Sequence, residues 1–138
     1  MKIECFLDTN VLLYAALGRR TEEEKRAIAA DLIGRSAFGI STQVLQEFYT
    51  AAIKQRHIAP LSPANARQWV VDLTRQPCAI VDKELIQVAI EISWRYRINY
   101  WDGAILAAAE RLGAEIVYTE DLNHQQSYGP VRVVNPFL

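Results

Sequence analysis

The sequence of 138 residues lacks most of the features that identify a function class at first sight. Its charges nearly balance, with 15 Lys and Arg against 16 Asp and Glu, so no general positive field indicates a protein that coats nucleic acid. No segment is repetitive, of low complexity, or apolar for long enough to span a membrane. Asp8 interrupts the first apolar run, which is not typical of a signal peptide, so we expect a soluble, cytoplasmic protein.

Cysteine and histidine are also scarce, with two of each. Cys5 and Cys78 lie in separate apolar runs, and neither has a Cys or His neighbour at the spacing of a zinc site. We therefore expect two buried free thiols in a reducing compartment. His57 and His124 are interpreted as a helix-end residue and a loop residue, not as catalytic bases.

The sequence does contain short apolar runs that alternate with helical patterns, and 51% of its residues are hydrophobic, enough for a core. This alternation predicts one α/β domain over residues 1–138, with helices on the faces of a parallel sheet. Strands are expected at 2–7, 37–40, 78–81, 115–119 and 131–134. The expected helices are 11–17, one that begins after a Thr21 cap and includes Ile33, one from a Ser41 or Thr42 cap to about Arg56, one from Ser62-Pro63 to about Leu73, one from an Asp82 cap to about Tyr96, and 101–112, which stops at Gly113.

Four acidic residues are candidates for a common site. Asp8 follows the first strand and Asp121 lies two residues past the strand 115–119, so parallel neighbouring strands would bring both to one edge of the sheet. Glu47 borders the apolar stripe of its helix, and Asp102 lies in the first turn of another. Taken singly, each has an ordinary explanation as a helix cap, a helix acid or a turn residue. Together they would repel one another unless a cation neutralised them, and hard divalent cations prefer oxygen ligands.

The stretches that hold these acids occur together in one known family. They are Phe6–Leu12 (FLDTNVL), Ser41–Tyr49 (STQVLQEFY), Tyr100–Ala109 (YWDGAILAAA) and Tyr118–His124 (YTEDLNH), followed by Val134–Phe137 (VNPF). In this order they resemble the PIN-domain ribonucleases, and specifically the VapC-type toxins of bacterial toxin–antitoxin pairs. Each stretch alone is weak, but the set is specific and spans nearly the whole chain.

The resemblance implies a three-layer α/β/α PIN-like domain with a short central parallel sheet. It implies that Asp8, Asp102 and Asp121 hold Mg²⁺ or Mn²⁺ and that Glu47 acts directly or through water. Such enzymes cut RNA endonucleolytically by two-metal-type hydrolysis, leaving a 5′-phosphate and a 3′-hydroxyl. A co-expressed antitoxin inhibits them, and they commonly form homodimers. The residues implied to orient acids and waters around the metal are Thr9, Asn10 and Thr119.

One position departs from the family pattern. Gln125 stands where many members have glycine, and glycine there would permit a positive φ. We therefore expect the loop after Asp121 to differ locally, which affects the pose of that carboxylate.

The aromatic and basic residues are secondary candidates for substrate contact. Trp69 and Trp94 lie on amphipathic helices and are expected in core or subunit contacts, whereas Trp101, next to Asp102, is the candidate for contact with a base. A few basic residues are expected to frame a phosphate track, and most to lie on solvated helix faces; they are Arg19, Arg20, Lys54, Arg56, Arg95 and Arg97.

Two other functions remain open from the sequence. A catalytically silent PIN-like module would bind a partner without cleaving RNA, but the complete set of four acids favours the enzyme. A phosphohydrolase of the haloacid dehalogenase type would also place an aspartate after the first strand. That class needs a second aspartate two residues after Asp8, where this chain has Asn10.

Overall fold

The computed structural model describes residues 3–18, 22–54, 57 and 59–138. Along the chain the elements are β1 (Cys5–Leu7), α1 (Thr9–Leu17), α2 (Glu23–Arg35), β2 (Phe38–Ser41), α3 (Thr42–Ala52), α4 (Pro63–Leu73), β3 (Cys78–Ala79), α5 (Lys83–Tyr96), α6 (Tyr100–Arg111), β4 (Ile116–Tyr118), β5 (Ser127–Tyr128) and β6 (Val131–Val134). The predicted alternation of short strands with helices is confirmed.

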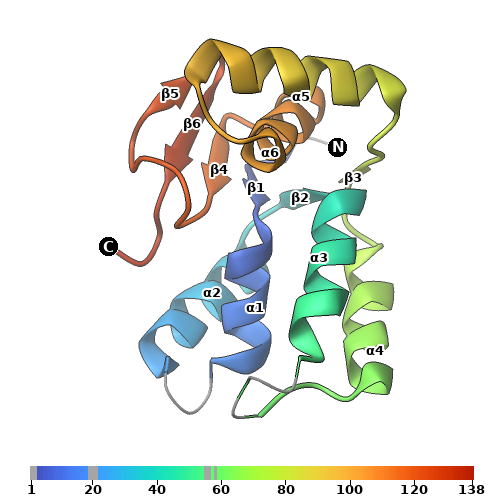
Figure 1. Cartoon of the computed structure of the whole chain (residues 1–138). Coiled ribbons are helices and arrows are strands. Elements are labelled where there is room, and N and C mark those ends of the chain that lie inside the picture. The colour runs from blue at the N-terminus through green and yellow to red at the C-terminus, as the bar shows by residue number, and fades with distance from the viewer. Residues whose placement is uncertain (1–2, 19–21, 55–56, 58) are drawn as a thin grey trace.

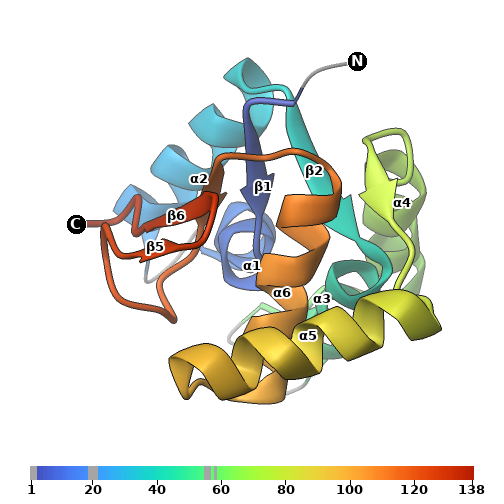
Figure 2. The same cartoon turned by 90° about the horizontal axis from the view of Figure 1, so that it is seen from above.

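The strands form one sheet in the order β3-β2-β1-β4-β6-β5. All neighbouring pairs are parallel except β5 with β6. Figure 1 shows α5 and α6 on one side of the sheet and α1 to α4 on the other, with β1 between α6 and α1, and the view from above in Figure 2 shows α5 lying across α6. The protein therefore has the predicted three-layer α/β/α fold with a mostly parallel central sheet.

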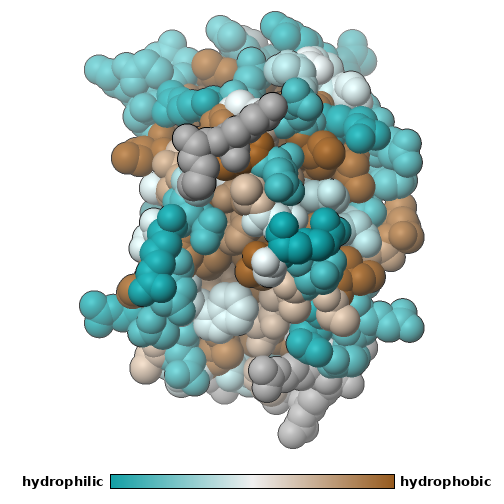
Figure 3. All heavy atoms as spheres, turned by 180° about the vertical axis from the view of Figure 1, so that it is seen from behind, coloured by the Kyte–Doolittle hydropathy of each residue, from teal (hydrophilic) through white to brown (hydrophobic). Residues whose placement is uncertain are grey.

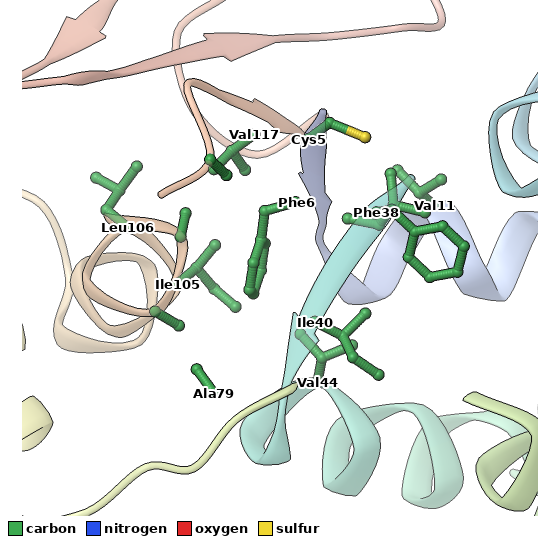
Figure 4. Close-up of a cluster of buried hydrophobic side chains, with 14 of the residues drawn as sticks. Cys5, Phe6, Val11, Phe38, Ile40, Val44, Ala79, Ile105, Leu106 and Val117 are labelled. Atoms are coloured by element: carbon green, nitrogen blue, oxygen red, sulfur yellow. The ribbon is translucent and has the colours of Figure 1, made fainter. Parts of the chain in front are cut away.

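The core lies on both faces of the central strands because neighbouring residues of a strand point to opposite faces. Phe6 points toward Ile105 of α6, whereas Phe38 of the neighbouring strand lies beside Val11 of α1 (Figure 4). All four side chains are buried. Cys5 is buried too, and burial raises the pKa of its thiol to about 11, as expected for an inert free cysteine. Cys78 is free and half-buried, so the expected burial of both thiols holds fully only for Cys5.

Several helix ends follow the predicted capping chemistry. The hydroxyl of Ser41 accepts a hydrogen bond from the Val44 N–H at the start of α3, and the hydroxyl of Ser62 does the same for α4, which has Pro63 at its first position. The carboxylate of Asp82 caps α5. Gly113, with φ +77°, follows the end of α6 as predicted.

Other boundaries differ from the prediction. Helix α3 ends at Ala52 rather than near Arg56, because the Ala52 carbonyl accepts a hydrogen bond from the Leu61 N–H of the returning chain. Glu22 precedes α2 without a side-chain cap. The predicted Thr21 cap and Arg56 lie outside the described residues. The short strand β5 was not predicted, since two residues carry no alternation of apolar and polar side chains.

The surface is mixed in character. On the rear face hydrophobic patches are separated by hydrophilic side chains (Figure 3). Within the part of the chain that the structure describes, no helix is long and apolar enough to cross a membrane.

Candidate active site

The four predicted acids lie around the carboxyl ends of three adjacent strands, β2, β1 and β4. Asp8 is the residue between β1 and α1, Glu47 lies on α3 directly after β2, and Asp121 follows β4. Because β1 pairs with β4 in parallel, as the sequence suggested, the first and last of these residues leave the sheet at the same edge. Asp102 lies in the first turn of α6.

Asp8 is the most buried acid of the group, with 5% of its surface exposed. Its Oδ1 accepts a hydrogen bond from the Thr9 N–H at 2.7 Å, and its Oδ2 accepts one from the Thr119 hydroxyl at 2.8 Å. Burial nevertheless raises the pKa of Asp8 to about 7, and the negative charges of Asp121 and Glu47 add to this rise while the two hydrogen bonds oppose it. Within the described part of the chain, no positively charged group offsets the burial of this carboxylate.

Thr119 connects the two strand ends. Its fully buried hydroxyl donates to Asp8 and accepts hydrogen bonds from the Asn10 side-chain amide and from the Asp121 N–H, each at 3.1 Å. A hydroxyl has one proton and two lone pairs, so all of its hydrogen-bonding capacity is used. The amide oxygen of Asn10, by contrast, is buried without a hydrogen-bond partner. Of the three polar residues that the resemblance implied, Thr9 and Thr119 therefore donate hydrogen bonds to acids of the group, and Asn10 donates one to Thr119.

Glu47 is oriented by neutral donors. Its Oε1 accepts a hydrogen bond from the Thr9 hydroxyl at 2.8 Å, and its Oε2 accepts one from the Gln43 amide at 3.3 Å. The same Gln43 amide nitrogen lies 3.3 Å from the Trp101 carbonyl, one residue before Asp102. Gln43 therefore links α3 to the beginning of α6.

Asp102 lies next to the helix cap of α6. The side chain of Asn99 accepts a hydrogen bond from the Asp102 N–H at 2.8 Å and donates its amide to the Asp102 carboxylate at 2.9 Å. Burial and then the charge of Asp121 raise the pKa of Asp102, Glu47 adds a smaller rise, and the Asn99 hydrogen bond opposes them. The charges of Asp121 and Glu47 thus act on both Asp8 and Asp102.

Only one of the two adjacent acids after β4 faces this group. Glu120 accepts hydrogen bonds from the Tyr14 hydroxyl at 2.6 Å and from the Lys25 ammonium at 3.2 Å. Lys25 also lies over the Tyr14 ring, 4.7 Å from its centroid, and Phe137 packs edge-on against that ring. Lys25 of α2 therefore neutralises the charge of Glu120. Asp121 is exposed, and its negative charge raises the pKa of Asp8.

The loop after Asp121 keeps a positive φ without glycine. Gln125 has φ +68°, and its N–H donates to the Val133 carbonyl at 2.7 Å. The ring of His124 accepts a hydrogen bond from the Asn135 N–H at 3.0 Å, which ties the loop to the C-terminal segment. Surrounding hydrogen bonds hold Gln125 in the left-handed conformation that glycine would adopt more easily, and the expected local difference of this loop from that of relatives stays a prediction.

Three residues that contact acids in and beside the site were not predicted from the sequence, namely Gln43, Asn99 and Lys25. Two had local signals. Gln43 lies four residues before Glu47 on one helix face, and Asn99 lies three residues before Asp102, as in a capping box. Lys25 had none, since its contact with Glu120 joins segments 95 residues apart.

The donor chemistry of the group fits a hard divalent cation. None of the ion pairs found among residues 3–18, 22–54, 57 and 59–138 includes Asp8, Glu47, Asp102 or Asp121. In the same residues no three acidic, His or Cys side chains stand close enough together to hold a metal ion as they are. The carboxylates stand apart, several of them held by neutral donors. Uncompensated oxygen ligands and an unpaired buried Asn10 oxygen still match the preference of Mg²⁺ or Mn²⁺.

The remaining candidates have mixed outcomes. Trp69 packs on Phe48 of the core, with ring centroids 5.6 Å apart, as predicted. Trp94 is 76% exposed, so it is not a core residue, and its expected subunit contact stays a prediction. His57 follows the end of α3 and its ring lies 2.9 Å from the Ala51 carbonyl, which supports its interpretation as a helix-end residue. Lys54, Arg95 and Arg97 are exposed, and Arg19, Arg20 and Arg56 lie outside the described residues.

Comparison with known proteins places these features in a family. A comparison with curated protein sequences gave no match. Among solved structures, a toxin–antitoxin complex from Klebsiella pneumoniae has a chain 18% identical to this one, with a TM-score of 0.70 over 96% of this chain and 98% of that chain. The sarcin-ricin loop cleaving toxin VapC20 of Mycobacterium tuberculosis is 20% identical, with a TM-score of 0.66 over 86% and 90%. FitAcB of Neisseria gonorrhoeae is 21% identical, with a TM-score of 0.64 over 96% and 98%. The family model of the PIN domain matches residues 5–129, and the chain therefore belongs to the PIN-domain family.

Proposed function

We propose that this protein is an endoribonuclease that depends on Mg²⁺ or Mn²⁺ and acts as the toxin of a toxin–antitoxin pair. The observation that carries the proposal is the state of Asp8. Its carboxylate is buried, its pKa is raised to about 7, and the acids that act on it, Asp121 and Glu47, make its environment more negative. A fold does not retain uncompensated buried charge for stability, so such a cluster is best explained by a bound cation.

Within this proposal the residues have distinct roles. Asp8, Asp102 and Asp121 would hold the metal, in a one-metal or two-metal arrangement, and the cation would supply Lewis-acid stabilisation of the negative charge that develops on the phosphate oxygens and on the leaving oxygen. Glu47, with one oxygen fixed by Thr9 and the other by Gln43, is placed to orient a water and to accept its proton.

The reaction is hydrolysis of a phosphodiester bond. The oxygen of water forms a bond to phosphorus, the bond from phosphorus to the 3′-oxygen breaks, and that oxygen takes up a proton. The products are a 5′-phosphate and a 3′-hydroxyl. Thr119 and Asn10 keep the Asp8 carboxylate and the Asp121 backbone in place during this step.

Proposed partners follow from the family and its structural neighbours. The Klebsiella pneumoniae neighbour was solved as a toxin–antitoxin complex, which supports an antitoxin partner for this chain. We expect that antitoxin to place an arginine against the acid cluster, because a guanidinium would supply the missing positive charge. A homodimer is proposed through α5, which exposes Ile86, Val88 and Trp94.

Cleavage of RNA under metal control tests the proposal. Purified protein is incubated with structured and single-stranded RNAs in Mn²⁺, with an EDTA arm. Asp8→Asn should abolish cleavage. Asp82→Asn is the matched control, because Asp82 is also an N-terminal helix cap but pairs with Arg111, and it should keep full activity.

Three outcomes count against the proposal. Cleavage that persists in EDTA would show that the reaction does not need the metal. Undiminished cleavage by Asp8→Asn would show that Asp8 has no role in it. If the wild type cleaves none of the RNAs but still binds a co-purifying partner, the chain is a silent PIN-like binding module.

A further inference from the structure

Trp101 is a large aromatic side chain left open to solvent directly beside the acid cluster. It is 62% exposed, although it immediately precedes Asp102 in the first turn of α6. The ring of Tyr100 packs edge-on against one side of the indole, with ring centroids 5.1 Å apart. A braced indole with a free face is a ready surface for another planar ring.

A hollow of about 270 Å³ lies between Trp101 and α3. Besides the indole it is lined by Gln43, Gln46, Glu47 and Thr50. Sites for drug-sized ligands start at about 300 Å³, so the hollow suits a single ring system. Among the described residues its lining contains amides, a hydroxyl and one carboxylate and no Lys or Arg, so it suits a neutral group better than a phosphate.

Two polar groups of the hollow are available to a ligand. The Gln46 amide forms no hydrogen bond within the part of the chain that is described, so it offers both a donor and an acceptor. The Thr50 hydroxyl donates toward the backbone carbonyls of Gln46 and Glu47, at 3.0 and 3.2 Å, which leaves its lone pairs free to accept. The edges of nucleobases present the complementary donors and acceptors.

The hollow shares a residue with the proposed active site. Glu47 belongs both to its lining and to the acid group that raises the pKa of Asp8. The Gln43 amide contacts the Glu47 carboxylate and the Trp101 backbone carbonyl, both at 3.3 Å, so one side chain joins the backbone that carries the indole to the proposed catalytic glutamate. A group bound here therefore lies next to a phosphate that is bound at the acids.

We propose that this hollow is a nucleobase subsite, in which one base of single-stranded RNA stacks on Trp101 and Gln46 contacts its edge. The inference rests on the proposed endoribonuclease function and deepens it. Stacking tolerates any base, whereas hydrogen bonds to the edge discriminate among bases. Trp101 thus supplies affinity and Gln46 supplies preference for the nucleotide beside the cleaved bond.

Binding measurements on the full chain test the subsite apart from catalysis. With Asp8→Asn in every protein to prevent cleavage, the affinity for short fluorescent single-stranded RNAs of mixed sequence is measured by anisotropy in Mn²⁺. Trp101→Ala should weaken binding about 10-fold, within the range of 1–3 kcal/mol for stacking of one base. Trp101→Phe should retain most of the affinity. Ile80→Ala, which removes another highly exposed hydrophobic side chain beside the opposite, C-terminal end of α6, is the matched control and should bind like the parent.

The outcomes separate this inference from the proposed function. Equal affinities of the Trp101→Ala and parent proteins, or equal losses from Trp101→Ala and Ile80→Ala, would overturn the subsite. So would a change of molecular mass in light scattering with Trp101→Ala, because the indole would then cover a second copy of the chain. If Trp101→Ala in the otherwise wild-type protein cleaves with unchanged KM, the subsite fails while the nuclease stands. If the parent binds RNA through Trp101 but the wild type never cleaves, the nuclease fails while the subsite stands.

Discussion

Replacement of Asp8 by asparagine should change the pH dependence of stability in a defined direction. The folded protein holds the Asp8 proton more tightly than the unfolded chain does, since the pKa rises from the ordinary 3.8 to about 7. Stability contributed by this group is therefore complete below about pH 4 and declines as the pH rises through 7. A difference of one in pKa corresponds to about 1.4 kcal/mol, so the full decline is about 4 kcal/mol, of which about 3 kcal/mol falls between pH 5 and pH 8.

The asparagine removes this decline but loses a hydrogen bond. Asp8 accepts from the Thr9 N–H and from the Thr119 hydroxyl, and that hydroxyl already accepts from Asn10 and Asp121. The new amide nitrogen therefore faces a donor in either orientation, which costs about 1–3 kcal/mol. The variant should be close to wild type at pH 5 and about 1–3 kcal/mol more stable at pH 8.

Urea unfolding followed by circular dichroism, in EDTA at both pH values, measures these differences. Asp82→Asn is a control of opposite sign. Arg111 lowers the pKa of Asp82 to about 2, so that carboxylate stabilises the fold above about pH 4 and its loss should destabilise the protein at both pH values. A difference between Asp8→Asn and wild type that is the same at pH 5 and pH 8 would refute the reasoning about Asp8.

Three further predictions concern the frame around the acids. Gly103→Ala should destabilise the protein by about 1–3 kcal/mol in urea unfolding, because a Cβ there would lie 2.6 Å from the Ala89 carbonyl of α5. Gly34→Ala, with open space around it, should stabilise α2 by about 0.5–1 kcal/mol. Equal effects of the two substitutions on the free energy of unfolding would contradict the close packing of α5 on α6. Gln125→Gly should raise stability by about 0.5–1 kcal/mol by relieving the positive φ, and Gln125→Ala should not; a gain from both would point to the side chain instead. Tyr14→Phe should cost about 1–2 kcal/mol by leaving Glu120 with one partner fewer, and an unchanged unfolding midpoint would show that the 2.6 Å hydrogen bond contributes little.

The parts of the fold that the sequence predicted are those with strong local signals. The caps at Ser41, Ser62 and Asp82 and the stop at Gly113 each depend on a few adjacent residues, and all four were predicted. The end of α3 was missed because it depends on Leu61, whose N–H reaches back to Ala52 from outside the helix. Tertiary hydrogen bonds of this kind leave no periodic pattern in the sequence.

The same division applies to the candidate site. Asp8 and Asp121 could be expected together because each follows a strand and their strands pair in parallel. The support around them could not be, since it depends on long-range contacts such as that of Thr119 with Asp8 and that of Lys25 with Glu120. Tyr14 on α1 holds Glu120 away from the cluster by a hydrogen bond across 106 residues of the sequence, and Asp121 is the acid of this pair that faces the cluster.

We propose that Asp8, Glu47, Asp102 and Asp121 form one divalent-cation site. Mn²⁺ binding measured by calorimetry at pH 8 is the most direct test of that site. Wild type and Asp82→Asn should bind Mn²⁺ alike. Asp8→Asn, Asp102→Asn and Asp121→Asn should each lose most of that affinity, with a smaller loss for Glu47→Gln, which acts through water. Equal Mn²⁺ affinity in the wild type and all four variants, or no binding by the wild type, would contradict the account.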